Sequence, residues 1–235
     1  MKHLPLTEAQ YKAVLEGAKT QIRIPVDPQP ELHEEGCGCD CFEPRGFPHF
    51  VYEGWTSPII PPPLLLGSGA DYKKADTVAL VLPYWQSPDE IPGGGRVTIW
   101  DAVSNLCRFR WPDGEVDWYE PSRLIPNSDE GWKLMPAPSM PDWACLHTVT
   151  VTDVRPEQLG DISAKDVEAE GVDVAAKLPA FPPPEVRSPE KLDELATFVA
   201  RLLFKELWES TYGKDSWNSE LWVWAYTFKL NKETQ

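Results

Sequence analysis

The sequence predicts an α+β fold: a β-sheet structure flanked by helices and interrupted by a β-rich insertion. Three observations predict it. A short amphipathic helix near the N-terminus runs directly into a strand-like stretch. Residues 77–119 contain several short strand-like stretches separated by turn residues. Near the C-terminus, a long amphipathic helix is followed by an apolar strand over residues 221–230.

The first helix and the strand after it are separated by a glycine. Tyr11, Val14 and Leu15 form an apolar stripe at helical spacing, and Gly17 can take the left-handed conformation that ends a helix. Side chains of the following strand alternate between a basic, polar face and an apolar face. The polar face carries Lys19, Gln21 and Arg23, and the other carries Thr20, Ile22 and Ile24.

Residues 25–48 are rich in Pro, Gly and acidic residues, which predicts a loop, and residues 50–55 follow as a strand. Cys37, Cys39, Cys41 and His33 in this loop form a candidate zinc site. Structural zinc sites usually separate two cysteines by two residues, and these cysteines alternate with single residues. We therefore expect free thiols and no cofactor, with structural zinc as the alternative.

Residues 57–66 hold a proline cluster and three leucines, which predicts a stiff connector. Asp113-Gly114 lies between two strand-like stretches and predicts a hairpin. The strands expected in this region are residues 77–83, 96–102, 106–111 and 115–119. We expect residues 57–131 to form a β-rich insertion.

The C-terminal third predicts a strand at residues 146–154, a helix between Ser163 and Gly171, and a long helix that begins at Pro189 and ends at Gly213. The last strand is apolar on both faces, so we expect it to be central in its sheet. The long helix is expected to bury one stripe, consisting of Leu192, Leu195, Ala196, Val199, Leu202, Leu203 and Leu207.

The segment VLEGAKTQIR, residues 14–23, resembles the Lys-Thr signature of the ASCH family, small β-barrels related to PUA RNA-binding domains, in the form common in phage proteins. Further similarities follow in the same order along the chain. They are Pro28-Gln29-Pro30; Gly46, Val51, Glu53 and Trp55; Met140-Pro141 and Trp143-Ala144; Val151 to Val154; Glu170-Gly171-Val172; and Trp222-Val223-Trp224.

The resemblance implies a PUA-like barrel formed by residues 1–56 and 132–235, because residues 57–131 show no counterpart. It also implies a protein that binds a modified pyrimidine nucleoside, a nucleotide or RNA in a pocket beside the barrel. Family members that are enzymes remove the acetyl group from acetylated cytidine, an amide hydrolysis. The chain is then an amidohydrolase or a relative that has lost the activity.

The resemblance assigns catalysis to a lysine, a threonine three residues later and a glutamate. Lys19 and Glu170 occupy the first and third positions, whereas Ile22 occupies the second and has no hydroxyl. An opposing carboxylate keeps a lysine ammonium charged, so we expect Lys19 to hold a carbonyl oxygen or a phosphate. Candidate ligand-binding residues beside them are Thr20, Arg23, Glu53 and Trp55, with Thr20 on the other strand face.

The formal net charge of -15 argues against a binder of long RNA, because such proteins neutralise phosphates with a basic surface. It favours a small nucleoside in a local basic pocket, or a basic protein partner. The alternative function is therefore a non-catalytic acidic interaction module that binds a host or phage protein. No apolar run long enough for a membrane span or a secretory signal occurs, and five cysteines suggest reduced thiols. We expect a cytoplasmic protein, in a bacterial host cell if it is phage-encoded.

Overall fold

The computed structural model describes residues 1–27, 29, 31–33, 49–52, 55–57, 70–87, 98–111, 114–119, 131–178 and 188–231. The chain divides into two compact units. Unit 1 consists of Met1–Gly17, Ala75–Val151 and Lys229–Gln235, and unit 2 consists of Ala18–Lys74 and Thr152–Phe228. The domain boundaries expected at residues 57 and 131 stay a prediction.

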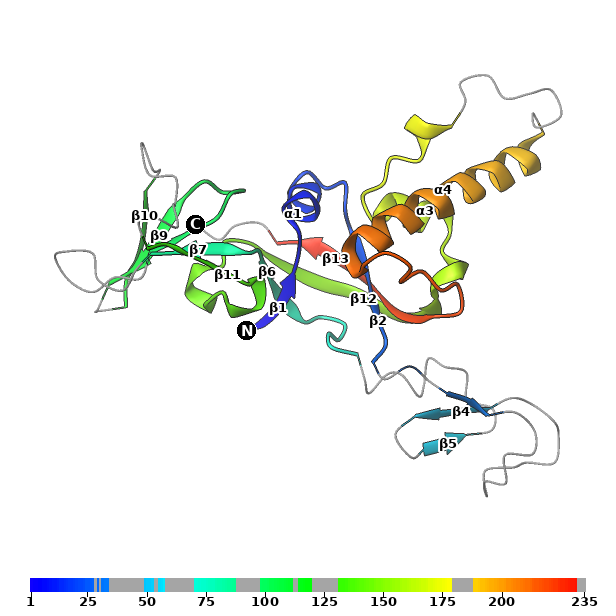
Figure 1. Cartoon of the computed structure of the whole chain (residues 1–235), viewed down its shortest axis with the longest axis horizontal. Helices are drawn as coiled ribbons and strands as arrows, with labels where there is room; N and C mark the ends of the chain where they lie inside the picture. The colour runs from blue at the N-terminus through cyan, green and yellow to red at the C-terminus, as the bar shows by residue number, and fades with distance from the viewer. Residues whose placement is uncertain are drawn as a thin grey trace. The chain divides into compact units, whose positions relative to one another are not determined.

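Strands and helices are mixed, as predicted, and one five-stranded sheet has the order β1-β6-β12-β13-β2 (Figure 1). β13 lies between two other strands, which confirms its predicted central position. β1 is parallel to β6, and the pairs β6–β12 and β13–β2 are antiparallel. The five strands are β1 (Lys2–Pro5), β2 (Gln21–Pro25), β6 (Thr77–Val81), β12 (Thr148–Gln158) and β13 (Trp222–Leu230).

The described strands form open sheets, which corrects the expectation of a closed PUA-like barrel. In a barrel every strand pairs on both sides, but β1 and β2 are the two edges of this sheet. At the β2 edge a helix end takes the place of another strand. Thr20 donates its backbone N–H to the carbonyl of Ala169 (2.7 Å), and Lys19 and Glu170 form an isolated antiparallel bridge. The backbone N–H of Thr20 is therefore bonded to the end of α3 and is not available to a further strand that would close the sheet.

A second five-stranded sheet, in unit 1, has the order β10-β9-β8-β7-β11. β9 and β10 pair in antiparallel fashion with Gly114 at φ +96° between them, which confirms the predicted hairpin. The strands are β7 (Tyr84–Gln86), β8 (Thr98–Trp100), β9 (Cys107–Arg110), β10 (Val116–Tyr119) and β11 (Lys133–Met135). In unit 2 a three-stranded sheet contains β3 (Glu31–His33), β4 (His49–Tyr52) and β5 (Trp55–Ser57). β1, β3, β7 and β11 were not predicted, and β5 overlaps the strand predicted at residues 50–55 only at Trp55.

Capping residues set the helix ends. Thr7 and Gln10 form a capping box at the start of α1 (Glu8–Leu15), and Gly17 follows that helix at φ +75°. The Ser163 hydroxyl accepts the N–H of Asp166 at the start of α3 (Ala164–Ala169). α4 (Pro189–Tyr212) begins with proline in its first turn and ends before Gly213. Single-turn 3-10 helices are η2 (Ala137–Ser139), η3 (Asp142–Ala144), η4 (Leu159–Asp161) and η5 (Ala175–Lys177).

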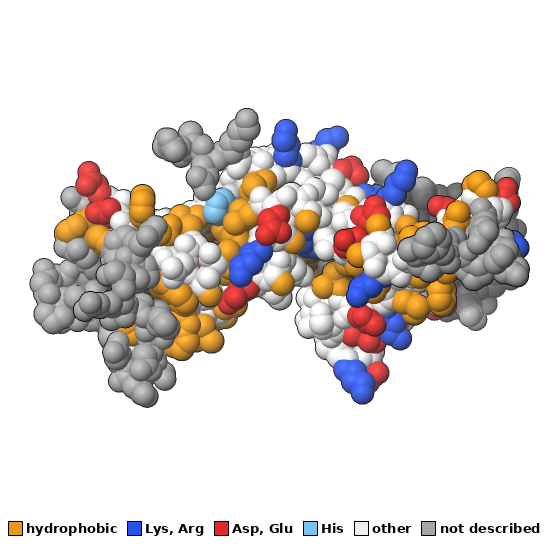
Figure 2. All heavy atoms as spheres, turned by 90° about the horizontal axis from the view of Figure 1, so that it is seen from above, with side chains coloured by type: hydrophobic (Ala, Val, Ile, Leu, Met, Phe, Trp, Pro, Cys, Tyr) orange, Lys and Arg blue, Asp and Glu red, His pale blue; other side chains and the backbone are white. Residues whose placement is uncertain are grey.

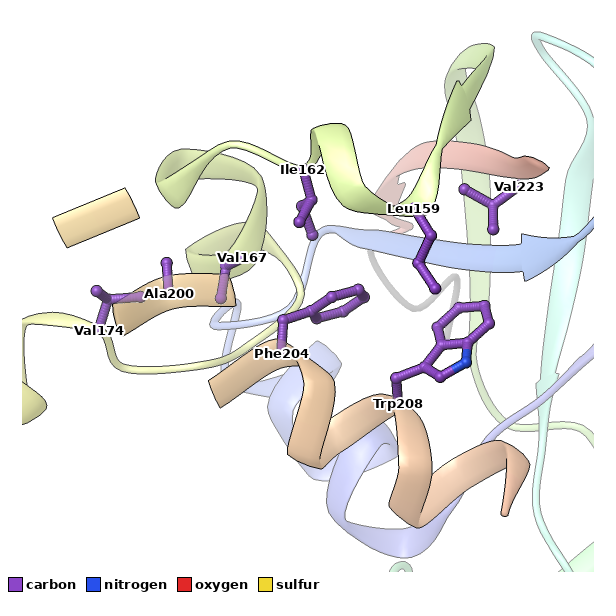
Figure 3. Close-up of a cluster of buried hydrophobic side chains, with 8 residues drawn as sticks. All are labelled: Leu159, Ile162, Val167, Val174, Ala200, Phe204, Trp208 and Val223. Carbon is purple, nitrogen blue, oxygen red and sulfur yellow. The ribbon is translucent and has the colours of Figure 1, made fainter. Parts of the chain in front are cut away.

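The core of unit 2 lies where α3 and α4 pack together beside the sheet (Figure 3). Val167 of α3 and Phe204 and Trp208 of α4 meet apolar side chains from the segment after β12 and from β13. The buried members of this core are Leu159, Ile162, Val167, Val174, Ala200, Phe204, Trp208 and Val223.

The buried stripe of α4 differs from the predicted one. Ala200, Phe204 and Trp208 are its buried residues, whereas Leu192 and Leu202 are exposed. The buried residues of α4 are spaced four residues apart, and they lie on the helix face that packs against α3 and β13. Leucine periodicity alone did not distinguish the two faces, because apolar residues occur on both.

Candidate functional site

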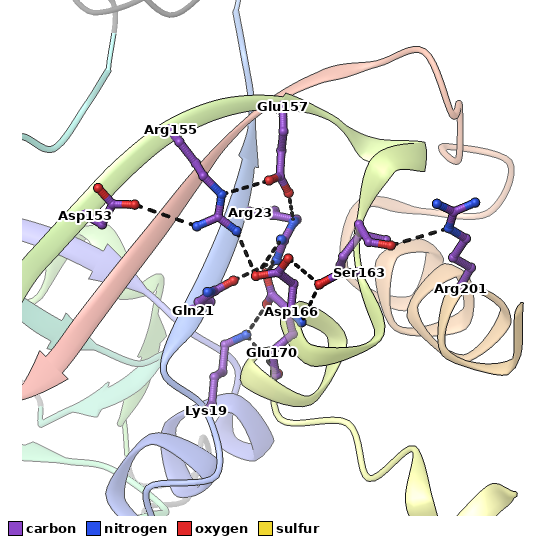
Figure 4. Close-up of polar contacts among 11 residues, drawn as sticks. Lys19, Gln21, Arg23, Asp153, Arg155, Glu157, Ser163, Asp166, Glu170 and Arg201 are labelled. Atoms are coloured by element: carbon purple, nitrogen blue, oxygen red, sulfur yellow. Dashed lines mark hydrogen bonds and ion pairs between the residues drawn. The ribbon is translucent and has the colours of Figure 1, made fainter. Parts of the chain in front are cut away.

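Lys19 and Glu170 lie together in unit 2, although 151 residues separate them along the chain (Figure 4). The Lys19 ammonium donates to Oε2 of Glu170 at 2.5 Å and to its backbone carbonyl at 3.1 Å. Lys19 precedes β2, and Glu170 is the C-cap residue of α3. Their exposed fractions are 1% and 5%, so the pair lies almost entirely out of water.

Arg23 joins the same pair from the same face of β2. Its Nη1 donates to Oε1 of Glu170 at 2.9 Å and its Nε donates to Glu157 at 2.6 Å. Its guanidinium also lies over the Phe204 ring, 5.7 Å from the centroid. Arg23 is only 2% exposed, and Tyr212 donates its hydroxyl to the Arg23 carbonyl (2.9 Å). Both carboxylate oxygens of Glu170 are thus bound by cations.

Arg155 of β12 closes the arrangement from the partly exposed side. It donates to Glu157 at 3.0 Å and to Asp166 at 2.7 Å. Asp166 also faces Arg23, at 3.7 Å in an ion pair. We call the whole group the ion cluster, which consists of Lys19, Arg23, Arg155, Glu157, Asp166 and Glu170.

The cluster holds its partly exposed members in their charged forms. Burial acts to raise the pKa of Asp166, but the Ser163 hydroxyl, Arg155 and Arg23 outweigh burial and leave that pKa below its usual value. For Arg155, burial acts to lower the pKa, and the carboxylates of Glu157 and Asp166 outweigh it and raise the pKa. Tyr212 differs from Asp166 and Arg155 because its neutral form is favoured. Burial and the Glu170 carboxylate both raise its pKa, so its hydroxyl stays protonated.

Ile22 occupies the position at which the ASCH resemblance implies a threonine, and it contributes no hydroxyl to the cluster. Ile22 pairs with Tyr226 of β13 and is 7% exposed, on the strand face opposite Arg23. Thr20 is exposed, and its backbone bonds to Ala169 and to Phe228. The structure thus brings Lys19, Arg23 and Glu170 together and leaves Thr20 outside the cluster.

The remaining predicted site residues lie partly or wholly outside the described part of the chain. Glu53 and the cysteines Cys37, Cys39 and Cys41 lie outside the described residues, and for Trp55 only its backbone, in β5, is described. Across the described part of the chain, His, Cys, Asp and Glu side chains form no group of three or more suited to a metal ion.

Sequence reasoning missed Arg155, Glu157 and Asp166 as members of the cluster. A signal for the first two existed, because Asp153, Arg155 and Glu157 alternate along β12, beyond the predicted strand end at residue 154. Asp166 lies three residues after Ser163 at the start of the predicted helix, a sequence position that indicates helix capping and not an ion pair. Its ion pairs depend on the tertiary position of α3, which no local pattern encodes.

Cys145 and His147 lie two residues apart in unit 1, where a cysteine and a histidine could in principle form a nucleophile. Burial and the nearby Asp142 raise the pKa of Cys145 to about 11, so its thiol is protonated at neutral pH. His147 bonds to the Tyr11 hydroxyl at 2.7 Å, as expected for a histidine satisfied within a core. These two residues therefore do not make a thiolate-imidazole pair.

The ion cluster offers paired donors and acceptors and no nucleophile from its own side chains. Comparison of the chain with family models, with curated proteins and with solved structures finds no match.

Proposed function

We propose that unit 2 is an ASCH-type module that binds the acetylated base of a modified pyrimidine nucleoside between Lys19 and Glu170 and does not hydrolyse it. The observation that carries the proposal is the direct contact of these two side chains in a buried position, 2.5 Å apart. An ammonium beside a carboxylate presents a donor next to an acceptor. The amide of acetylated cytidine presents the complementary pair, a carbonyl and an N–H.

Burial of the cluster supports a functional role over a structural one. Removing charges from water costs several kcal/mol per ion, and apolar residues of similar volume often stabilise a fold as well or better. Lys19 and Arg23 are among the largest fully buried side chains of the described residues. Polar groups held at such cost are common at binding and catalytic sites.

Two observations favour binding over hydrolysis. Ile22 stands where the enzymes of the resembled family have the threonine, and it faces away from Arg23. Both carboxylate oxygens of Glu170 already accept hydrogen bonds, one from Lys19 and one from Arg23, so neither is free to take a proton from an attacking water. The charges therefore suit electrostatic recognition of a polar group.

Entry of a ligand requires the end of α3 to move away from β2. α3 is six residues long, and Gly171 directly after Glu170 has φ +91°, a conformation that glycine adopts without strain. Moving the end of α3 breaks the two bonds of Glu170 from Lys19, its bond from Arg23 and the backbone bond from Thr20 to Ala169. A ligand amide replaces the bond between the side chains of Lys19 and Glu170.

The test is calorimetric titration of the chain with acetylated cytidine, with unmodified cytidine as the matched ligand. We expect saturable binding of the acetylated nucleoside and at least about tenfold weaker binding of cytidine. Lys19→Met is expected to abolish binding, while Lys165→Met, an exposed lysine of the same unit, leaves it unchanged. Equal affinity for both nucleosides, or no binding of either, contradicts the proposal.

Chromatography of the same mixtures tests the absence of hydrolysis. The parent chain is expected to leave acetylated cytidine intact. If Ile22→Thr releases acetate, the chain retains the rest of a hydrolytic site. If the parent chain itself releases acetate, binding without turnover is wrong.

A further inference from the structure

A cavity of about 330 Å³ lies in unit 2, on the sheet face opposite the ion cluster. Val154 and Pro156 of β12 line it, and they alternate along the strand with residues whose side chains join the ion cluster. Arg155 also borders the cavity, but its guanidinium points to Glu157 and Asp166 (Figure 4). The cavity is thus separate from the contact between Lys19 and Glu170.

Aromatic side chains form part of its walls. Trp224 of β13 pairs with Ile24 of β2, next to the pair formed by Arg23, so its side chain lies on the face opposite the guanidinium. Tyr72 comes from the segment that precedes β6 and contacts the Tyr226 ring edge-to-face, with centroids 5.1 Å apart. Aromatic walls of this kind let a planar ring pack against them.

The same segment supplies two adjacent cations. Lys73 and Lys74 line the cavity and are exposed, so they lie where it meets solvent. Among the described residues that line the cavity, Lys73, Lys74 and Arg155 are cations and none is acidic, although the Asp71 carboxylate lies near Tyr72. Lysine binds phosphate as a point charge, and two lysines match the double charge of a phosphomonoester better than the single charge of a carboxylate.

We propose that this cavity is a second ligand site, which takes a nucleoside monophosphate with its base against Trp224 and Tyr72 and its phosphate at Lys73 and Lys74. The volume lies at the lower end of the range for small-molecule sites, about 300–1,000 Å³, which suits a mononucleotide. The site does not depend on the proposed function, because Lys19 and Glu170 do not line the cavity.

The test is calorimetric titration of the full chain with uridine and adenosine 5′-monophosphates, each compared with its nucleoside. We expect both monophosphates to bind at least about tenfold more tightly than the nucleosides, and to weaken as salt rises. Saturating acetylated cytidine is expected to leave the titration unchanged. No saturable binding below about 1 mM, or equal affinity for uridine and its monophosphate, overturns the proposal.

Matched charge variants locate the phosphate. The double variant Lys73→Gln/Lys74→Gln is expected to lose about tenfold or more in affinity for the monophosphates. Lys165→Gln/Lys177→Gln removes the same charge from exposed positions elsewhere in unit 2 and is expected to change affinity less than twofold. Equal losses in the two double variants overturn the assignment of the phosphate to Lys73 and Lys74.

A cavity-filling variant locates the base. Val154→Phe places a ring into the cavity and is expected to weaken monophosphate binding about tenfold, with circular dichroism reporting the fold. Unchanged affinity in the folded variant places the nucleotide elsewhere. If this variant does not fold, the lysine variants decide the question.

Discussion

At the scale of single residues, strand alternation correctly predicts the face of β2 on which Arg23 lies. It does not predict that this face is buried. The predicted polar face of β2 suggests a solvated guanidinium, yet Arg23 is 2% exposed and bonds to Glu157 and Glu170. Removing one partner of a buried ion pair leaves uncompensated charge, which costs more than the intact pair contributes.

Arg23→Ala is therefore expected to lower the free energy of unfolding by about 3–5 kcal/mol. Arg201 of α4 is the matched control, because it is exposed and its single bond, to the Ile162 carbonyl, measures 3.4 Å. Arg201→Ala should cost less than about 1 kcal/mol. Urea denaturation of both variants measures the difference, and equal losses would show that the cluster is not a buried network.

Asp166 links the cluster to pH. Its pKa in the folded chain is lowered, against burial, by Ser163, Arg155 and Arg23, whereas an unfolded aspartate titrates near about 3.9. Its carboxylate thus stabilises the fold above about pH 4, and this contribution is lost as pH falls through the lower folded-state value.

Asp166→Asn is expected to flatten the decline of stability below about pH 4, when the variant and the parent are unfolded at several pH values. Asp161→Asn, an exposed site in the same unit, provides the comparison. If the two variants show the same pH slope, Asp166 does not contribute to acid sensitivity.

At this scale the sequence predicted part of the site. The meeting of Lys19 with Glu170 came from family resemblance, since no spacing rule joins residues 151 positions apart. The placement of Arg23 beside Lys19 came from strand alternation. Lys73, Lys74 and Trp224 were not predicted to share a cavity, because their proximity results from the pairing of β13 and the path of the chain before β6.

At the scale of elements, α4 shows where periodicity succeeds and where it fails. Its start at Pro189 and its end at Gly213 follow from local chemistry and were predicted correctly. Its buried face depends on which side meets α3 and β13, and that choice is tertiary. β1 and β3 were missed for a related reason, because strands of three or four residues carry too little alternation to be recognised.

A matched pair on α4 tests the observed face. Phe204→Ala removes a side chain that is 2% exposed and is expected to cost about 3–5 kcal/mol. Phe198→Ala removes one that is 62% exposed and should change stability by less than about 0.5 kcal/mol. Chemical denaturation of the two variants checks the face, and a larger loss for Phe198→Ala than for Phe204→Ala would contradict the observed buried face.

At the scale of the whole molecule, charge limits the class of ligand. Acidic and basic side chains are interspersed on the face shown in Figure 2, and no extended basic patch gathers there. With a net charge of -15, the chain is expected to repel long polyanions while single cationic sites still bind small anions. Among the described residues, no helix combines the length and apolar character needed to cross a membrane.

Chromatography on a heparin column measures this expectation. The chain is expected to pass through at about 150 mM salt, because heparin and RNA are both extended polyanions. Retention to substantially higher salt would reveal a basic surface and would favour RNA over mononucleotides as the ligand.

The distance along the chain between β2 and α3 also matters during synthesis. Chains emerge from the ribosome N-terminus first, so Lys19 and Arg23 leave it well before Glu157, Asp166 and Glu170 are made. Until then, two cations destined for burial have none of these carboxylates to face, and unit 2 cannot complete its interior. We expect unit 2 to complete its ordering only after the residues of α3 have left the ribosome.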